Sequence, residues 1–185
     1  MGPMRKIINS TYITLDGVIQ EPQDWPSLGS SDDRGLTLQT ELLLSCELQI
    51  MGRRTYEGFA SVWPGRSGDP YSDHINAMRK LVFSSQVADP GWENTVVVAE
   101  DPVKTVRKIK TEDGGDIVQY GFGHLAHQLM AAGLIDELRL WVHPFFIGRG
   151  GPDALLYRDT ATASLALAAT TALDNGIVIL TYRKS

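Results

Sequence analysis

The sequence predicts one α/β domain whose sheet is mostly parallel, with an antiparallel edge at the C-terminus. Strand-like and helix-like segments alternate through the middle of the chain, and strand-like segments alone complete it. Within residues 164–184, two apolar runs flank an Asp-Asn-Gly turn at 174–176, which is typical of a hairpin. No linker, repeat or low-complexity segment divides the chain. We therefore expect residues 4–185 to form a single domain, and we interpret residues 1–3 as a cloning remnant.

The individual elements follow from the spacing of apolar residues, which alternate in strands and recur every three to four positions in helices. The first helix, capped by residues 30–33, is expected to present one apolar face from Leu36 to Cys46. Asp101 and Pro102 are a typical start for a later helix. The expected helices span 33–46, 54–63, 71–78, 101–112 and 123–133. The expected strands span 6–13, 48–52, 80–85, 94–99, 116–121 and 136–147, followed by the hairpin within 164–184.

The composition excludes several classes of function. The formal net charge is −5, and no run of basic residues offers a surface for nucleic-acid phosphates. No stretch of about 18 apolar residues is present to span a membrane. The N-terminus lacks the features of a signal peptide, so we expect a cytoplasmic protein. The single cysteine, Cys46, builds neither a disulfide nor a cysteine metal site and is expected to be a buried thiol. The spacing of His74, His124, His127 and His143 does not predict a metal site.

A glycine-rich turn lies between the strand expected at 116–121 and the helix expected at 123–133. Gly121, Gly123 and Ala126 have the spacing G-x-G-x-x-A, which can bring backbone N–H groups to a dinucleotide phosphate at a helix N-terminus. A Rossmann site would also need an acid at the end of the next strand, and that strand ends without one. The motif alone is compatible with a tight structural turn as well as with a phosphate cradle.

Polar residues follow two further strands at their carboxyl ends. Arg53 and Arg54 come directly after the strand at 48–52 and can pair with phosphate oxygens. Ser84 and Ser85 end the next predicted strand. Taken singly, each motif is more typical of a basic turn or a polar strand end. Because the carboxyl ends of parallel strands share one edge of a sheet, we expect these residues and the glycine turn to converge on one cleft for a phosphate-rich ligand.

These motifs occur in an order that resembles a known family. "GRRTYEGF" at 52–59, "KLVFSSQ" at 80–86, the glycine turn and "LIDELRLWVHPFFIGRGGP" at 134–152 are similar to the dihydrofolate-reductase-like superfamily. Within it, the chain resembles the branch named after the C-terminal reductase domain of the bifunctional riboflavin-biosynthesis deaminase-reductase. The resemblance runs from Ile7 to Tyr182. It implies a dihydrofolate-reductase-like three-layer fold, with a mostly parallel twisted sheet flanked by helices and a C-terminal antiparallel hairpin.

The resemblance also implies an NADPH site at the three strand ends. Two arginines and two serines favour NADPH over NADH, since the 2′-phosphate needs cationic and hydroxyl partners and the sequence shows no acid placed to prefer a free hydroxyl. The matching positions are Gly52, Arg53, Arg54 and Thr55 for the phosphates, Ser84 and Ser85 for the adenosine region, and Gly121, Phe122, Gly123, His124 and Leu125 for the pyrophosphate turn.

The segment "TYITLDGVIQEPQDW" at 11–25 resembles the strand and loop that close over nicotinamide and substrate in this family. The resemblance places Ile13, Asp16 and Gly17 at the nicotinamide end, with Asp16 facing the substrate; a plain turn at Asp16-Gly17 is the alternative. A second expectation is an aromatic wall for a flat heterocycle, because rings stack favourably. Its candidates, each also compatible with a core position, are Trp25, Tyr56, Trp63 and Phe122.

The resemblance implies an NADPH-dependent oxidoreductase that transfers a hydride to the C=N or C=O carbon of a small pterin-, folate- or pyrimidine-like substrate. Dihydrofolate reductases carry an acid on the first long helix, but Asp32, Asp33 and Glu41 lie out of register with it. Riboflavin-pathway reductases usually carry a lysine at about the position where this chain has Ser10 instead. The sequence therefore assigns no catalytic residue and leaves the substrate open. The alternative is a non-catalytic NADPH- or pterin-binding protein. Apolar residues in "LWVHPFF" at 140–146 and in the terminal hairpin favour a homodimer.

Overall fold

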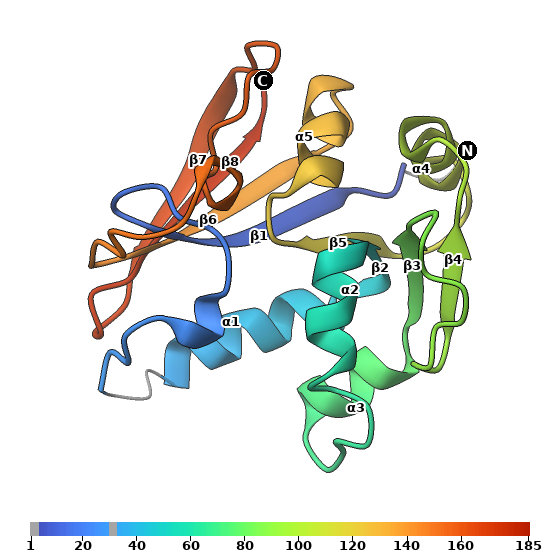
Figure 1. The fold of residues 1–185 in the computed structure, drawn as a ribbon, viewed down its shortest axis with the longest axis horizontal. Coiled ribbons are helices and arrows are strands. Elements are labelled where there is room, and N and C mark those ends of the chain that lie inside the picture. The colour runs from blue at the N-terminus through green and yellow to red at the C-terminus, as the bar shows by residue number, and fades with distance from the viewer. Residues whose placement is uncertain (1–3, 30–32) are drawn as a thin grey trace.

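The computed structural model describes residues 4–29 and 33–185, and its centre is an eight-stranded sheet (Figure 1). The strands lie in the order β4-β3-β2-β5-β1-β6-β8-β7. The first six strands of the chain pair in parallel, and β8 and β7 add an antiparallel hairpin at one edge, so the predicted fold class is confirmed. The strands are β1 (Ile7–Thr14), β2 (Cys46–Gly52), β3 (Arg79–Phe83), β4 (Thr95–Val98), β5 (Asp116–Tyr120), β6 (Glu137–His143), β7 (Leu165–Ala172) and β8 (Val178–Lys184).

Helices cover both faces of the sheet, with α4 and α5 on one side and α1, α2 and α3 on the other (Figure 1). Ile109 of α4 and Leu129 of α5 belong to the same core as Ile50 of β2. Ile75 of α3 belongs to a second core with Met51, the next residue along β2. Because successive strand residues point to opposite faces, β2 contributes to both cores. The helices are α1 (Asp33–Leu44), α2 (Arg53–Ala60), α3 (Pro70–Ala77), α4 (Pro102–Lys110) and α5 (His124–Ala131), with 3-10 turns η1 (Pro22–Asp24) and η2 (Pro152–Ala154).

Two helix boundaries confirm the sequence prediction. The carboxylate of Asp101 accepts a hydrogen bond from the Lys104 N–H at 2.7 Å and so caps α4, and Pro102 is the first helical residue. Gly133 follows α5 with φ +64°, the left-handed conformation that commonly ends a helix. These local signals are strong because each satisfies backbone groups that the helix itself leaves unpaired.

The first helix differs from its prediction at its C-terminal end. α1 ends at Leu44, and Cys46 is the first residue of β2 rather than part of the helical face. Leu36 is 66% exposed, because α1 turns Leu42 rather than Leu36 toward the sheet. Here an apolar helix runs directly into a buried strand, so the sequence carries no break that marks the boundary. The predicted cap at residues 30–32 lies outside the described residues.

Cys46 is a buried structural thiol, as expected. The residue is fully buried at the start of β2. Burial raises the pKa of the Cys46 thiol to about 11, so the nucleophilic thiolate is scarcely populated at neutral pH.

The last parallel strand is shorter than predicted. β6 ends at His143 rather than continuing to residue 147. Pro144 follows immediately and has no N–H to donate to a neighbouring strand. The chain leaves the sheet there, and Phe146 is exposed. Residues 144–164, which connect β6 to β7, therefore form a long surface segment that contains η2.

The C-terminal hairpin forms as its turn residues predict. Gly176 has φ +90°, a conformation that favours glycine, and its N–H donates to the Leu173 carbonyl at 3.0 Å. Ile177 and Ile179 are buried and pack with Trp141 of β6. β8 is thus anchored to the domain, whereas β7 is an edge strand exposed along most of its length.

Lys80 of β3 is a buried amine whose titration makes folding stability depend on pH. Its Nζ donates to the carbonyls of Met78 at 2.7 Å and Asn76 at 3.1 Å and lies over the Trp92 ring. Burial lowers the pKa of Lys80 from 10.5 to about 8. Between these two values the unfolded chain holds a proton that the folded protein has released. The contribution of Lys80 to the free energy of unfolding therefore rises with pH across that window.

We expect the variant Lys80→Met to remove this pH dependence. Urea unfolding of the wild-type protein and of the variant across the window from about pH 8 to pH 10 gives the difference between their unfolding free energies. As the pH rises, the unfolding free energy of the wild-type protein should increase relative to that of the variant. A difference that stays constant with pH would show that Lys80 titrates normally.

Candidate active site

The candidate site lies where the chain passes from β2 into α2 and from β5 into α5. β2 and β5 are neighbours in the sheet, but α2 and α5 cover opposite faces (Figure 1). In an open α/β sheet, this arrangement leaves a crevice outside the carboxyl ends of the two strands. A cavity of about 400 Å³ occupies that position. Its lining includes Gln20, Gly52, Arg53, Arg54, Thr55, Gln119, Tyr120, Gly121, Gly123, His124, Leu125, Asp153 and Arg158.

A second cavity, also of about 400 Å³, adjoins the first on the side of β3 and β4. Ser84 and Ser85 line it at the end of β3. The two cavities share Gly52 and Arg53 at the start of α2, and His124 and Leu125 at the start of α5. The predicted convergence of three strand ends is therefore confirmed. Their common boundary is a pair of helix N-termini.

Glycine N-caps leave the first N–H groups of α2 and α5 without a side-chain acceptor. Gly52 caps α2 and Gly123 caps α5, both with extended backbone and no capping side chain. In contrast, α3 and α4 carry Asp69 and Asp101, whose carboxylates accept from the first turn. Uncapped N–H groups and the positive end of the helix dipole favour an anion. Both helix starts that border the two cavities can thus bind phosphate oxygens.

The turn before α5 is held in place by β1. Gly121 has φ +77°, and its N–H donates to the Ser10 carbonyl at 3.0 Å while its own carbonyl accepts from Asn9 Nδ2 at 2.9 Å. A side chain at Gly121 would be strained by this backbone conformation. A Cβ at Gly123 would instead meet no atom within 4 Å. Gly121 therefore shapes the turn, whereas Gly123 keeps the space beside α5 open.

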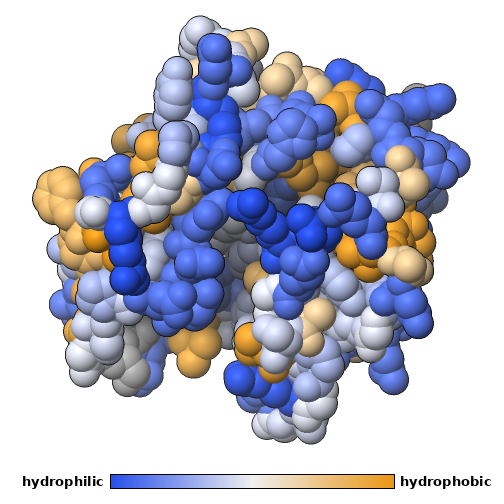
Figure 2. Space-filling view, viewed as in Figure 1, coloured by the Kyte–Doolittle hydropathy of each residue, from blue (hydrophilic) through white to orange (hydrophobic). Residues whose placement is uncertain are grey.

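The first cavity is rich in cationic side chains although the whole protein is acidic. Arg53 is exposed and lies 3.4 Å from Glu57, one helical turn along α2. Arg54 is exposed and makes no ion pair with any described residue. Arg158, from the segment between β6 and β7, also lines this cavity. In the space-filling view of Figure 2, strongly hydrophilic side chains gather around the hollow at the centre of this face.

Several lining residues were missed by the sequence reasoning, and three of them carry polar or charged groups that bear on the ligand. Gln20 and Arg158 lie in loops, where no apolar periodicity indicates which side chains reach a cavity. Glu100 follows β4 and lines the second cavity with Ser84 and Ser85. The expectation that no acid stands near the two serines is therefore wrong. Only the order of strands in the sheet, which the sequence did not settle, shows that β4 ends beside β3.

The loop after β1 is fixed by Asp16, which faces a loop rather than either cavity. Its carboxylate accepts from the Thr14 hydroxyl at 2.5 Å and from the N–H groups of Gly148 at 2.8 Å and Ile147 at 3.1 Å. These bonds lower the pKa of Asp16 to about 2. Asp16 is therefore a structural turn residue in this structure. The Thr14 contact closes the turn, and the contacts with Gly148 and Ile147 hold two loops together.

Two other residues predicted at the nicotinamide end lie near the cavities without lining them. Ile13 is half-buried on β1, and neither it nor Gly17 belongs to the lining of either cavity. The carbonyl of Gly17 accepts from the Leu156 N–H at 2.9 Å. The β1 loop instead reaches the first cavity through Gln20.

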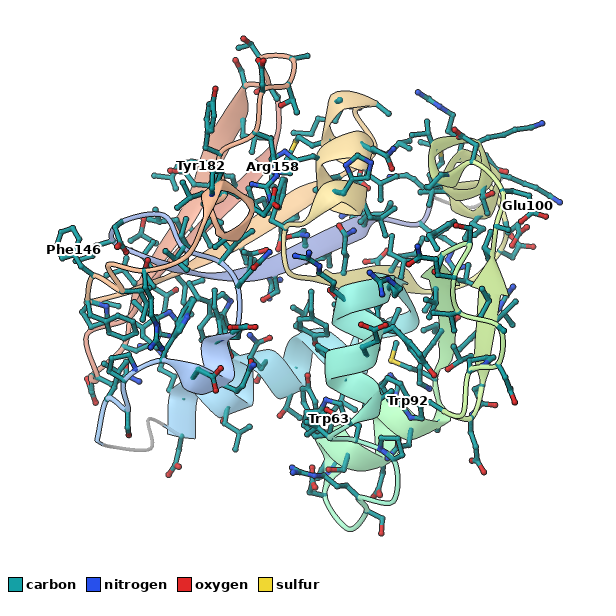
Figure 3. The ribbon with its side chains drawn as sticks, in the orientation of Figure 1. Trp63, Trp92, Glu100, Phe146, Arg158 and Tyr182 are labelled. Carbon is teal, nitrogen blue, oxygen red and sulfur yellow. The ribbon has the colours of Figure 1, made fainter. Side chains whose placement is uncertain are left out.

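The four aromatic candidates do not form one wall. Trp25 packs edge-on against His143 at a ring distance of 5.1 Å. Tyr56 is buried in the core beneath α1, α2 and α3, and Trp63 packs against that core, away from the end of β5 (Figure 3). Phe122 is buried beneath α5, on the other face of the sheet. This expectation is wrong because Tyr56 and Trp63 belong to the core on one face of the sheet, Phe122 belongs to the core on the other face, and Trp25 packs beside the end of β6.

No carboxylic acid of α1 reaches the cavities. Asp33 and Glu41 are both exposed, and neither lines the first or second cavity. Asp32 lies outside the described residues.

Across residues 4–29 and 33–185, no group of three or more His, Cys, Asp or Glu side chains could hold a metal ion. The same part of the chain contains no helix long and apolar enough to cross a membrane.

Three known proteins show what the chain is similar to in sequence and in fold. The protein is 27% identical to the uncharacterized protein YyaP of Bacillus subtilis, over 96% of this chain and 94% of that one. A putative riboflavin biosynthesis protein from Shewanella sp. PV-4 matches with a TM-score of 0.73 and 19% identity, over 97% of this chain and 99% of that one. Acinetobacter baumannii RibD matches with a TM-score of 0.70 and 14% identity, over 99% of this chain but 58% of its own.

These structural neighbours have the dihydrofolate-reductase-like fold, which confirms the fold implied by the sequence resemblance. The sequence model of the RibD C-terminal domain family matches residues 5–179, which is nearly the whole chain. That range includes β1 to β7, the first two residues of β8, and all three strand ends of the candidate site. The chain belongs to the RibD C-terminal domain family.

Proposed function

We propose that the protein is an NADPH-dependent reductase of a small pterin-, folate- or pyrimidine-like substrate. The observation that carries the proposal is the pair of glycine-capped helix N-termini shared by the two cavities. A pyrophosphate at α2 and α5 would place the two halves of a dinucleotide in the two cavities. Two structural neighbours support the reductase class: one from Thermotoga maritima is described as a deaminase/reductase, and one from Corynebacterium diphtheriae is described as pyrimidine reductase-like.

The cavity residues fit the parts of NADPH by their chemistry. The first-turn N–H groups of α2 and α5 take the pyrophosphate, and the open space beside Gly123 admits it. Arg53 borders both cavities and can bind the 2′-phosphate together with Ser84 and Ser85. Glu100 opposes that phosphate from the same cavity, so the preference for NADPH depends on the arginine and the serines.

Bound NADPH supplies the hydride, and the chain positions it and excludes water. The segments that follow β1 and β6 close one side of the first cavity: the Ile19 N–H donates to the Ala154 carbonyl at 2.8 Å, and Gln20 Nε2 donates to the Asp153 carbonyl at 2.7 Å. No acid of α1 lines the cavity, and the carboxylate of Asp16 is engaged by two loops. We therefore propose that water supplies the proton; Asp153, an acid that lines this cavity, is the side-chain alternative.

Loss of NADPH absorbance in the presence of candidate substrates tests the proposal. The panel contains dihydrofolate, other pterins, flavin precursors with a pyrimidine ring, and small carbonyl compounds. Oxidation of NADPH that depends on both protein and substrate would support a reductase. Tight NADPH binding without turnover on any substrate would instead support the non-catalytic binding protein, and absence of NADPH binding would contradict both.

We further propose that the protein is a homodimer joined through β7. Natural edge strands usually carry charges or prolines that prevent pairing, but β7 has the sequence LALAATTA and an unpaired edge. Sedimentation at micromolar concentration should give the mass of a dimer. Leu167 is 57% exposed, so Leu167→Lys should leave the domain folded and shift it to a monomer. A monomeric wild-type protein would contradict the proposal.

A further inference from the structure

Arg158 carries a charge that no carboxylate of the described residues neutralises. Its guanidinium donates to four backbone carbonyls: Nη1 to those of Pro152, Leu155 and Tyr157, and Nη2 to that of Asp153, at distances of 2.5 to 3.2 Å. No Asp or Glu oxygen of the described residues lies within 4.0 Å of it. Carbonyls supply dipoles but no net negative charge. The side chain is thus held rigidly while its positive charge remains available to an anion.

The segment that carries Arg158 is tied to the loop after β1. Leu155 forms an antiparallel bridge with Val18, and the Leu156 N–H donates to the Gly17 carbonyl at 2.9 Å. These bonds make residues 152–158 a wall of the first cavity, facing α5. Figure 3 shows Arg158 beside α5, on the side away from Glu100.

The surroundings of Arg158 add positive rather than negative potential. His127 lies close on α5, where burial and the charge of Arg158 both lower the pKa of its imidazole. Arg53 and Arg54 line the same cavity from α2. Asp153 lines it as well, but its carboxylate is not paired with Arg158. Three guanidinium groups around one cavity repel each other unless an anion lies between them.

Arg158 lines the first cavity and is absent from the lining of the second. Ser84 and Ser85 line only the second. The helix N-termini of α2 and α5 border both cavities and so lie between them. We therefore expect Arg158 to contact the same anion as the helix starts. It would approach that anion from the side opposite the adenosine region.

We propose that Arg158 completes the phosphate site, binding the pyrophosphate of the dinucleotide from the wall opposite α2. The inference rests on the proposed function, because a dinucleotide must occupy the cleft. Within the pocket, Arg53 distinguishes NADPH from NADH, whereas Arg158 contacts a group that both cofactors possess. One planar guanidinium with an unused Nη2 hydrogen can donate to a phosphate oxygen without releasing its carbonyl partners.

Calorimetric titration of the full-length protein with NADPH and with NADH tests this role. Arg158→Gln should weaken both cofactors by the same factor, about ten-fold, as expected for the loss of one hydrogen bond to a charged group. Arg149→Gln is the matched control. Arg149 lies in the same connecting segment and donates to the Asp24 carbonyl at 3.2 Å, but it lines neither cavity. It should leave both affinities unchanged.

Several results would overturn the inference. Unchanged affinity of Arg158→Gln for both cofactors would remove Arg158 from the phosphate site, as would a loss confined to NADPH. Equal weakening by Arg149→Gln would show that loosening the segment, rather than removing the charge, causes the effect. If the wild-type protein binds neither cofactor, the proposed function itself fails, and that outcome is distinct from a failure at Arg158 alone.

Discussion

Arg53→Ala is expected to weaken NADPH at least ten-fold while changing NADH affinity by much less. Arg53 is the arginine that borders both cavities and so stands nearest to Ser84 and Ser85. Only NADPH carries the 2′-phosphate, and a charge-assisted bond to it contributes about 1.5–3 kcal/mol. The pair with Glu57 is exposed and stabilises the helix little, so its loss should leave folding intact. Titration of the variant with each cofactor measures the ratio.

Three further variants make this prediction specific. Glu100→Gln should raise the preference for NADPH, because it removes a negative charge from the second cavity. The sequence suggests that both arginines favour NADPH, but Arg54 lines only the first cavity, so Arg54→Ala should weaken both cofactors alike. Arg79→Ala makes the same charge change at the amino end of β3, at the opposite edge of the sheet, and should change neither affinity. Equal losses of NADPH and NADH in Arg53→Ala would remove its 2′-phosphate role.

Gly123→Ser is expected to weaken cofactor binding without lowering folding stability. The backbone of Gly123 is extended, with φ −83°, so serine fits without strain. Its hydroxyl can accept from the first-turn N–H groups of α5, as Asp101 does in α4. The variant should be as stable as the wild-type protein or more stable, by about a few tenths of a kcal/mol. Binding of NADPH and NADH should both fall about ten-fold or more, because the side chain takes donors and space from the pyrophosphate.

Two other glycine variants are the controls for this prediction. Gly58→Ala lies within α2, where a Cβ meets no atom within 4 Å, and should raise stability by roughly 0.5–1 kcal/mol without changing cofactor affinity. Gly121→Ala should lower stability by roughly 1–2 kcal/mol, because its φ is +77°. Thermal and urea unfolding give the stabilities. Undiminished cofactor affinity in Gly123→Ser would show that the start of α5 does not bind phosphate.

The sequence predicts the architecture well wherever a local signal sets it. The Asp101 cap, the left-handed Gly133 and the Asp-Asn-Gly turn each satisfy backbone groups within a few residues, and each is found as expected. The predicted boundary between α1 and β2 lies too late, because Leu42 and Cys46 fit one helical spacing of apolar residues although they belong to different elements. Local chemistry therefore fixes element ends more securely than hydrophobicity does.

The candidate site was predictable only in part, for reasons of topology. Gly52, Arg53 and Gly121 follow strands directly, so the parallel sheet alone brings them together. Arg158 and Glu100 reach the cavities through a long connection and an edge strand, whose spatial neighbours no periodicity reveals. The prediction of an aromatic wall failed because the sequence does not show which face of the sheet buries each ring. Composition identifies rings but not the face of the sheet on which each one is buried.

A crystal structure of the wild-type protein with NADPH is the measurement that tests the central claim most directly, namely that one dinucleotide spans the two cavities. We expect the pyrophosphate between the N-termini of α2 and α5, with the 2′-phosphate beside Arg53, Ser84 and Ser85. A dinucleotide bound elsewhere on the molecule, or one whose pyrophosphate lies away from both helix N-termini, would contradict the account.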